Sequence, residues 1–211
     1  MRLLIALAVS LLAAGCAVPP RPIVQPFADG RQWVLEHDLD YRLLDSEHVV
    51  HVPRGFVTDF ASVPRIAWPI MSPTGPLGRA GVVHDFLYWD QGCKSREVAD
   101  KIMLLAMIES DVGPLQQTLV YGTLRSAGSS AWDGNAVERA EGKPRNIPED
   151  YRKTWATPQW LNKNWPEFQS FLYSNGVRPL PQTTPTYCSA VDELLDKASC
   201  SWWRRLTWRC S

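Results

Sequence analysis

A stretch rich in proline and glycine, from Arg54 to Gly78, divides this chain into two unlike parts and limits its possible folds. The stretch holds four prolines and three glycines, which interrupt both helices and strands. Short runs of β-branched and aromatic residues precede it, whereas longer runs with helical spacing follow it. This order favours an α+β fold, in which a small N-terminal antiparallel sheet is followed by a helical hairpin and further helices.

Three short runs ahead of that stretch have the composition of strands, at residues 32–35, 41–44 and 48–52. They are rich in valine, leucine and aromatic residues, and aspartate and serine, which favour turns, lie between them. Pro53 closes the third run. We therefore expect a small antiparallel sheet of three strands in this part of the chain.

Helical spacing and end signals mark the second part of the chain. Ser95 is a suitable N-cap, Pro114 suits a first helical position, and Asn175 with Gly176 is typical of a helix end. The expected helices cover residues 77–89, 95–110, 114 to between 125 and 132, 158–164, 166–173 and 189–199. Residues 177–187 are rich in proline and are expected to be extended.

The first fifteen residues have the anatomy of an export signal. Arg2 precedes an apolar run at residues 3–14 that is too short to span a bilayer, and Cys16 follows closely. Residues 12–16 resemble a bacterial lipobox, which implies that Cys16 receives acyl chains such as palmitate and holds the protein at a membrane. The alternative is an ordinary cleaved signal followed by an incidental cysteine.

This signal predicts both a location and a division of the chain. By resemblance to the sorting rules of bacteria with two membranes, Ala17 implies a lipid-anchored protein of the outer membrane that faces the periplasm. We expect a signal peptide at residues 1–15 and a lipidated, proline-rich tether at 16–30. A compact domain at 31–134 and a tryptophan- and proline-rich extension at 135–211 complete the expected organisation.

Charge and cysteine content limit the partners and the chemistry. The 22 basic and 22 acidic side chains leave a net charge of zero, so nucleic acid is not an expected partner. With Cys16 acylated, four cysteines remain, at Cys93, Cys188, Cys200 and Cys210. In an exported chain they predict up to two disulfides, with three possible pairings.

A histidine and an aspartate are expected to face each other across a helical hairpin. His84 lies five residues before the expected helix end at Trp89, and Asp100 lies five residues after the next start at Ser95. At 1.5 Å per residue both lie about 7–8 Å from the turn, so they are level in an antiparallel pair. Because an unpaired buried carboxylate is costly, Asp100 should bond to His84 or to the Tyr88 hydroxyl.

This contact allows two interpretations. In the catalytic one, Asp100 fixes the tautomer of His84, which takes a proton from a bound water as a general base. Asp85, next in sequence, would then bind a cation or contact the reacting group from the opposite side. In the structural one, His84, Tyr88 and Asp100 form a satisfied polar network that locks the hairpin. The residues alone leave both interpretations open.

The loop after the third run carries a second candidate group. Gly55, Thr58, Asp59 and Ser62 could bring a carboxylate, hydroxyls and backbone groups to a substrate. The alternative is structural, because Asp59 and Ser62 could cap nearby backbone amides while the phenylalanines of the loop fill the core.

The order of these motifs resembles a family of domains of unknown function, the one numbered thirteen fifty-three, which occurs in phages and bacteria. The residues that carry the resemblance are the loop from Val52 to Pro64, then His84, Asp85, Leu87 and Tyr88, then Ala99 and Asp100. The resemblance covers about Gln32 to Gly128. It implies a compact domain often encoded by phages or prophages, with no established reaction.

The hairpin alone is similar to the paired helices of secreted phospholipase A-two enzymes. This similarity implies that His84 activates water, that Asp100 and Tyr88 orient the histidine, and that Asp85 binds calcium. Asp59 would lie in the loop that replaces the calcium loop of those enzymes, whose cysteine-rich and glycine-rich sequence this chain lacks. Ca²⁺ is the one cofactor that the similarity implies.

Two functions remain for test. The first is an envelope lipoprotein with a binding or structural role, whose partner is the membrane, an envelope lipid or another envelope protein. The alternative is a hydrolase that uses the histidine–aspartate pair to activate water. The sequence slightly favours the first, because no nucleophile, complete metal cage or known hydrolase motif is visible.

Overall fold

The computed structural model describes the backbone of residues 21–60 and 75–207, with side chains as far as residue 199. The predicted signal peptide, Cys16, Ser62 and Cys210 lie outside the described residues, as does the side chain of Cys200. None of the described helices combines the length and the apolar composition that crossing a bilayer requires.

The described chain has the expected α+β fold, with its strands near the N-terminus. These strands are β1 (Val24–Pro26), β2 (Trp33–Leu35), β3 (Leu39–Arg42), β4 (Val49–Val52) and β5 (Val57–Thr58). They form two sheets rather than the single sheet that was predicted. One sheet has the order β1-β2-β5 and the other pairs β3 with β4, and all pairs are antiparallel. The three predicted runs are therefore divided between the sheets, because β2 pairs with strands that the sequence pattern did not mark.

Helices follow the strands, as predicted. They are α1 (Leu77–Asp90), α2 (Arg96–Glu109), α3 (Pro114–Ala127), α4 (Ser129–Ala140), α5 (Glu149–Trp155), α6 (Pro158–Leu161), α7 (Trp165–Ser174) and α8 (Val191–Thr207). The sequence predicted neither α4 as a separate helix nor α5. Helix α7 ends as expected at Asn175, and Gly176 follows with a φ of 82°, a conformation that glycine adopts without strain.

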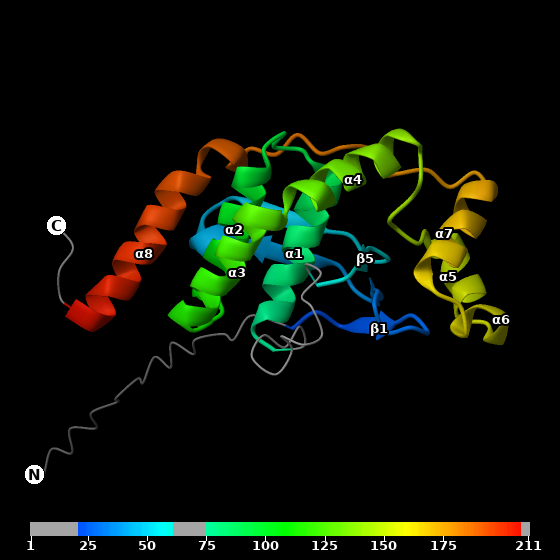
Figure 1. Ribbon diagram of the computed structural model, residues 1–211, viewed down its shortest axis with the longest axis horizontal. Coiled ribbons are helices and arrows are strands. Elements are labelled where there is room, and N and C mark those ends of the chain that lie inside the picture. Colours follow the sequence, from blue (N-terminus) through cyan, green and yellow to red (C-terminus); the bar gives the residue numbers. More distant parts are fainter. Residues whose placement is uncertain (1–20, 61–74, 208–211) are drawn as a thin grey trace, which may run out of the picture.

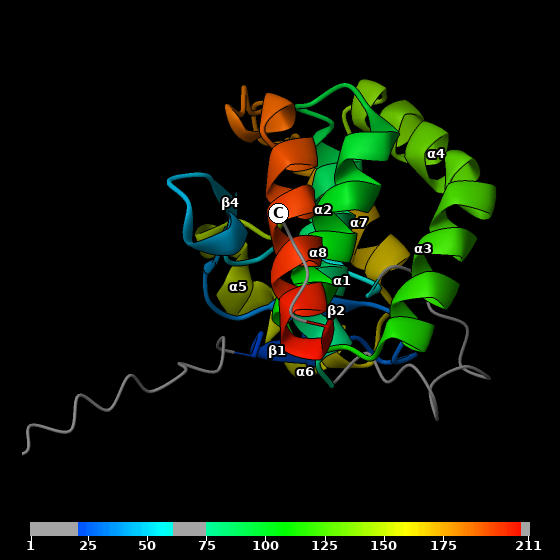
Figure 2. The same cartoon turned by 90° about the vertical axis from the view of Figure 1, so that its left-hand side faces the viewer.

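Helix α1 lies at the centre of the molecule and is buried on nearly every side. Of its fourteen residues only Arg79 is not buried. It packs against α2, α4, β4 and β5. Figure 2 shows α3 and α4 on one side of the α1–α2 pair and β4 on the other. A helix covered all round needs no polar face, so its strongly apolar composition follows from its position.

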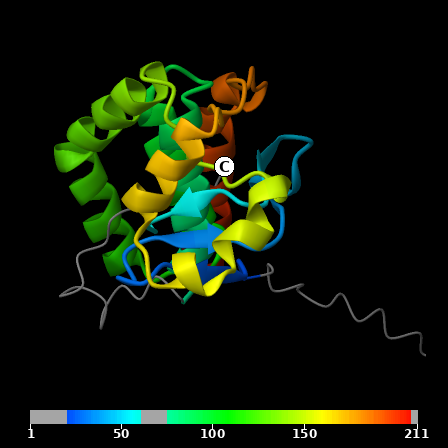
Figure 3. The ribbon, with the colours of Figure 1, turned by 90° about the vertical axis from the view of Figure 1, so that its right-hand side faces the viewer.

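The part of the extension from Ile147 to Val177 packs against the first sheet, whereas α8 packs against α2. Phe27, Val34 and Val57 from the sheet region join a core that Trp155 and Phe168 share. Figure 1 shows α8 and the α5–α7 group at opposite ends of the long axis, and Figure 3 shows α5 to α7 beside the blue and cyan strands. A disulfide between Cys93 and Cys188 joins the α1–α2 turn to the segment before α8. This bond occurs in one of the three predicted ways of pairing the four cysteines.

Candidate active site

The α1–α2 hairpin brings His84 and Asp100 together, as their spacing predicted. The Nε2 atom of His84 lies 3.1 Å from Oδ1 of Asp100. Their side chains are 2% and 0% exposed. Helix α1 ends at Gln91, whose φ of 55° turns the chain back, and α2 starts after Ser95, so both residues lie level on facing helices. The predicted contact is therefore confirmed.

Tyr88 completes the predicted group. Its hydroxyl donates a hydrogen bond to Oδ1 of Asp100 at 2.6 Å, and its ring centre lies 4.0 Å from that of His84. Tyr88 follows His84 by one helical turn, so both side chains project toward the same point of α2. One carboxylate oxygen thus serves two partners from α1.

Two arginines that the sequence analysis missed bind the other oxygen of Asp100. Arg96 and Arg125 each place a guanidinium nitrogen near Oδ2, at 3.1 Å and 3.2 Å. Arg96 also donates to the carbonyl oxygen of Leu124 at 2.7 Å, which joins α2 to α3. The position of Arg96, four residues before Asp100, was a signal for this pair, whereas nothing in the local sequence marks Arg125.

These contacts fix the charges of the pair. Burial pushes the pKa of Asp100 upward, but the hydrogen bonds from His84, Tyr88 and Arg125 outweigh it, so the pKa lies below the ordinary value. Burial lowers the pKa of His84 below its ordinary value, although the hydrogen bond and charge of Asp100 act in the opposite direction. At neutral pH the site therefore holds an aspartate anion beside a neutral imidazole.

The two nitrogens of that imidazole have different roles. Because ionised Asp100 can only accept, the Nε2 of His84 carries the proton and donates it, which leaves a lone pair on Nδ1. Nδ1 is buried, and within residues 21–60 and 75–199 it has no hydrogen-bond partner. Buried polar atoms are rarely left unpaired in folded proteins, so this nitrogen is the chemically free position of the network.

Asp85, the next residue on α1, faces the loop after β5 rather than α2. Its Oδ2 accepts hydrogen bonds from the hydroxyl of Thr58 and from the backbone N–H of Asp59, the latter at 2.9 Å. The loop can approach because Gly81 has no side chain, since a Cβ there would lie 3.2 Å from the Cα of Phe60. Burial, and next the charge of Asp59, raise the pKa of Asp85 well above its ordinary value.

Asp59 connects this cluster to the surface. Its side chain is 27% exposed, whereas those around it are buried. The charge of Asp59 also acts on His84, where it raises the pKa, and on Asp85. Arg145, from the extension, lies 4.0 Å away across the loop and was not predicted as part of the site. Thr58, Asp59 and Asp85 thus form one hydrogen-bonded cluster, and the charge of Asp59 acts on His84.

Gly55 packs closely against the extension. It has a φ of 87°, and a Cβ there would lie 2.3 Å from the carbonyl oxygen of Ile147. Its N–H donates to Leu35 and its carbonyl accepts from Ile147. These contacts join the loop to the extension, and the close packing requires a glycine at this position. Its role at a substrate stays a prediction.

The calcium expectation gains no support from the described residues. No group of three or more histidine, cysteine or acidic side chains there could hold a metal ion. Calcium takes six to eight oxygen ligands, and Oδ2 of Asp85 already accepts two hydrogen bonds beside Asp59. The described residues do not fit the ion, and no chemical step is assigned to it.

Comparison with known proteins relates one part of the chain to a protein family and shows no activity. Residues 33–124, which carry the hairpin and the β5 loop, match the model of a family described as "Protein of unknown function (DUF1353)". No curated protein and no solved structure matches the chain. The predicted resemblance is therefore confirmed over nearly the whole range that the motifs indicated.

Proposed function

We propose from the site alone that this domain is a general-base hydrolase centred on His84, since the family model that residues 33–124 match is described only as a protein of unknown function. The observation that carries the proposal is the pairing of His84 Nε2 with ionised Asp100, which leaves Nδ1 basic and without a partner in the part of the chain that the structure describes. The sequence slightly favoured a binding role. The orientation of the imidazole favours the hydrolase instead, because in a purely structural network both ring nitrogens would be expected to form hydrogen bonds.

The proposed reaction is attack of water on an ester. Nδ1 of His84 removes a proton from water while the water oxygen forms a bond to the carbonyl carbon. The ester C–O bond then breaks, and the imidazolium returns its proton to the departing alkoxide oxygen. Asp100, held by Arg96 and Arg125, stays ionised and stabilises the positive charge that His84 carries between the two steps.

The proposed substrate class is an ester of an envelope lipid. A chain acylated at Cys16 would be held within reach of such esters, since attachment through several acyl chains keeps a protein at the membrane surface. The partly exposed carboxylate of Asp59 supports an approach to His84 from that side. Location in the envelope, attachment through Cys16 and the relation to phages all belong to this proposal.

A second function is a binding or structural role without catalysis. The observation that favours it is burial: His84 is 2% exposed, and Asp100 joins α1, α2 and α3 through Tyr88, Arg96 and Arg125. Such a network would lock the helices whether or not water reaches Nδ1. The domain would then present its surface to another envelope component.

Comparison of three chains separates these functions. The parent, His84→Asn and His51→Asn are assayed for fatty acid released from vesicles of envelope phospholipid, and for thermal stability. His51 is a matched control, because it pairs with Asp40 at 2.6 Å but its side chain is 58% exposed. We expect release by the parent and by His51→Asn, and at least a hundredfold loss in folded His84→Asn. Absence of release by the parent would favour the binding role.

The attachment is tested separately. Cells fed an alkyne-labelled fatty acid should label the parent protein, and Cys16→Ser should abolish the label and release the protein from the membrane fraction. Cys210→Ser is the control, because it removes a cysteine far from the proposed lipobox. Persistent labelling of Cys16→Ser would contradict the proposed anchor.

A further inference from the structure

One edge of the molecule brings together β1, α6 and the first turn of α3, and we call it the β1 edge. Strand β1 is the outer strand of its sheet and, within the described residues, pairs only with β2. Figures 1 and 2 show β1 and α6 along the lower edge of the molecule, where α3 also begins. Just after β1, the backbone N–H of Ala28 donates to the carbonyl oxygen of Lys163, just after α6, at 3.3 Å. Segments far apart in the sequence therefore share this edge.

Each of the three parts of the β1 edge carries an exposed apolar side chain. Ile23, directly before β1, is 60% exposed, Leu115 in the first turn of α3 is 70% exposed, and Leu161 at the end of α6 is 45% exposed. One exposed leucine or isoleucine needs no explanation in a folded protein. Three of them from separate elements along one edge give that edge an apolar character, which suits contact with an apolar partner.

The position of the proposed anchor selects this partner. Ile23 follows Cys16 by seven residues, and seven residues span at most about 25 Å. An acylated Cys16 lies at the surface of a bilayer, and because that attachment belongs to the proposed function, the present inference rests on it. The bilayer is thus the apolar partner that the anchor holds within reach of the β1 edge.

The charged side chains around β1 suit the phosphate level of a bilayer. Arg21 before β1 and Arg31 after it are both exposed. A guanidinium stays charged and forms paired hydrogen bonds with phosphate, while its aliphatic stem can lie on apolar surface. The nearby acidic groups are already engaged: Asp29 accepts from the backbone N–H of Arg31 at 3.0 Å, and Glu167 pairs with Lys163 at 2.6 Å. The two arginines therefore complement lipid phosphates.

We propose that the β1 edge, through Ile23, Leu115 and Leu161, lies on the phospholipid bilayer that holds the acyl chains of Cys16. The apolar side chains enter the headgroup region, and Arg21 and Arg31 meet lipid phosphates. The anchor limits only the distance between the domain and the membrane. This contact goes further, because it fixes which side of the domain faces the membrane.

The test places a photo-crosslinking amino acid, p-benzoylphenylalanine, at one of the three edge positions. The acylated chain, with its disulfide intact, is reconstituted in vesicles of phosphatidylethanolamine and phosphatidylglycerol and illuminated. Phospholipid joined to the protein is then measured by mass spectrometry. The reagent reacts only with groups that it contacts, so an adduct reports that the chosen position touches lipid.

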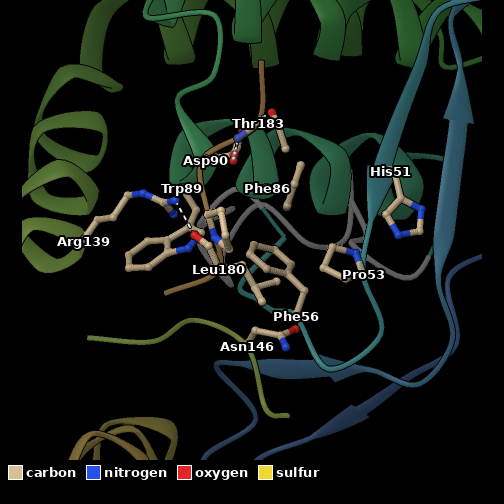
Figure 4. A pocket seen from close by; sticks show the side chains of 11 residues that line it. His51, Pro53, Phe56, Phe86, Trp89, Asp90, Arg139, Asn146, Leu180 and Thr183 are labelled. Carbon is tan, nitrogen blue, oxygen red and sulfur yellow. Dashed lines mark hydrogen bonds between the residues drawn. The ribbon is translucent and has the colours of Figure 1, made fainter. Parts of the chain in front are cut away.

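Val137 and Leu180 are the matched control positions. They are 57% and 46% exposed, close to the values of Ile23 and Leu161. They belong to α4 and to the segment before α8, which lie along the opposite edge in Figure 1. Figure 4 shows Arg139 of α4 directed at the carbonyl oxygen of Leu180, to which it donates at 2.6 Å, so the two controls lie on segments that are held together.

We expect lipid adducts at the edge positions to be at least about fivefold more frequent than at the controls, since an interfacial surface is buried in the headgroup region. Vesicle-bound protein without adducts at the edge, or with equal adducts at both edges, would overturn this proposal alone. A protein that does not stay with the vesicles would contradict the attachment and this inference together.

Acidic substitutions test whether the three positions act as one surface. Ile23→Asp combined with Leu161→Asp should lower the frequency of lipid adducts at position 115 about tenfold, because a carboxylate resists transfer out of water. Val137→Asp combined with Leu180→Asp should leave it unchanged. Thermal unfolding of each variant verifies that it is folded. Equal adducts at position 115 in the two double variants would overturn the proposal.

Discussion

Oδ1 of Asp100 lies 3.1 Å from Nε2 of His84, across a hairpin in which both side chains are almost fully buried. The same carboxylate binds Arg96 and Arg125 through its other oxygen. A single acidic side chain therefore orients the imidazole of α1 and joins α2 to α3. Both the stability of the fold and the proposed chemistry therefore depend on the carboxylate of Asp100.

Removal of the charge of Asp100 should destabilise the protein strongly. Asp100→Asn removes a fully buried anion that Arg96 and Arg125, themselves 21% and 35% exposed, both bind, and we expect a loss of about 2–4 kcal/mol in the free energy of unfolding, measured with urea. Asp192→Asn is the control, because its ion pair with Lys101 is at the surface, where the side chain of Asp192 is 75% exposed. The control should lose less than about 1 kcal/mol. Equal losses would contradict the role assigned to Asp100.

Replacement by alanine should change the free energy of unfolding in opposite directions at two glycines. A Cβ at Gly128 would lie 2.5 Å from the hydroxyl oxygen of Tyr88 and 2.6 Å from the carbonyl oxygen of Leu124, whereas a Cβ at Gly122 meets nothing within 4 Å. We expect Gly128→Ala to lose about 1–3 kcal/mol because the Tyr88–Asp100 contact must shift. Gly122→Ala, inside α3, should gain about 0.5–1 kcal/mol. Thermal unfolding measures both, and a stabilised Gly128→Ala would show that the junction has room.

The pH dependence of stability should change in Asp85→Asn. Because the pKa of Asp85 is raised in the folded state, the folded protein holds a proton that the unfolded chain releases from about pH 3.8 upward. The parent therefore loses stability through this group as the pH rises toward the folded pKa. An asparagine oxygen still accepts from Thr58 and Asp59 but does not ionise. We expect the stability of Asp85→Asn relative to the parent to increase with pH; a constant difference would rule out the raised pKa.

The disulfide should contribute to stability through the extension. It closes a loop of 95 residues between Cys93 and Cys188. Replacement of both cysteines by alanine should cost about 2–5 kcal/mol. The measurement is urea unfolding of the double variant against the oxidised parent, with the reduced parent as a second reference. Identical midpoints for oxidised parent and variant would mean that the bridge adds nothing.

The local part of the site was predictable from the sequence, and the long-range part was not. Helical spacing and the two end signals sufficed to place His84, Tyr88 and Asp100 together, because all three lie in one hairpin. Arg125 and Arg145 reach the site from α3 and from the extension, and no local pattern encodes such contacts. Thr58 and Asp59 of the loop contact Asp85, and Gly55 packs against the extension, while the predicted contact of this loop with a substrate stays a prediction.

The pairing of the strands also depends on long-range contacts that no local sequence pattern predicts. Strand β5 has two residues and β1 has three, so alternation over such short runs carries little information. Strand β1 lies within the segment expected as a tether, and its pairing with β2 is a tertiary contact. The extension could not be placed at all from its composition, although its tryptophans Trp155 and Trp165 turn out to be buried in the second core.

The most direct test of the account is the protonation state of His84 by nitrogen-15 NMR of the histidine rings, with His84→Asn used to assign the signals. The account predicts a neutral ring at pH 7 with the proton on Nε2 and an unprotonated Nδ1, which becomes protonated only below the ordinary histidine pKa of about 6.5. A ring that carries its proton on Nδ1, or that is already an imidazolium at pH 7, would contradict the claim that His84 offers a free base.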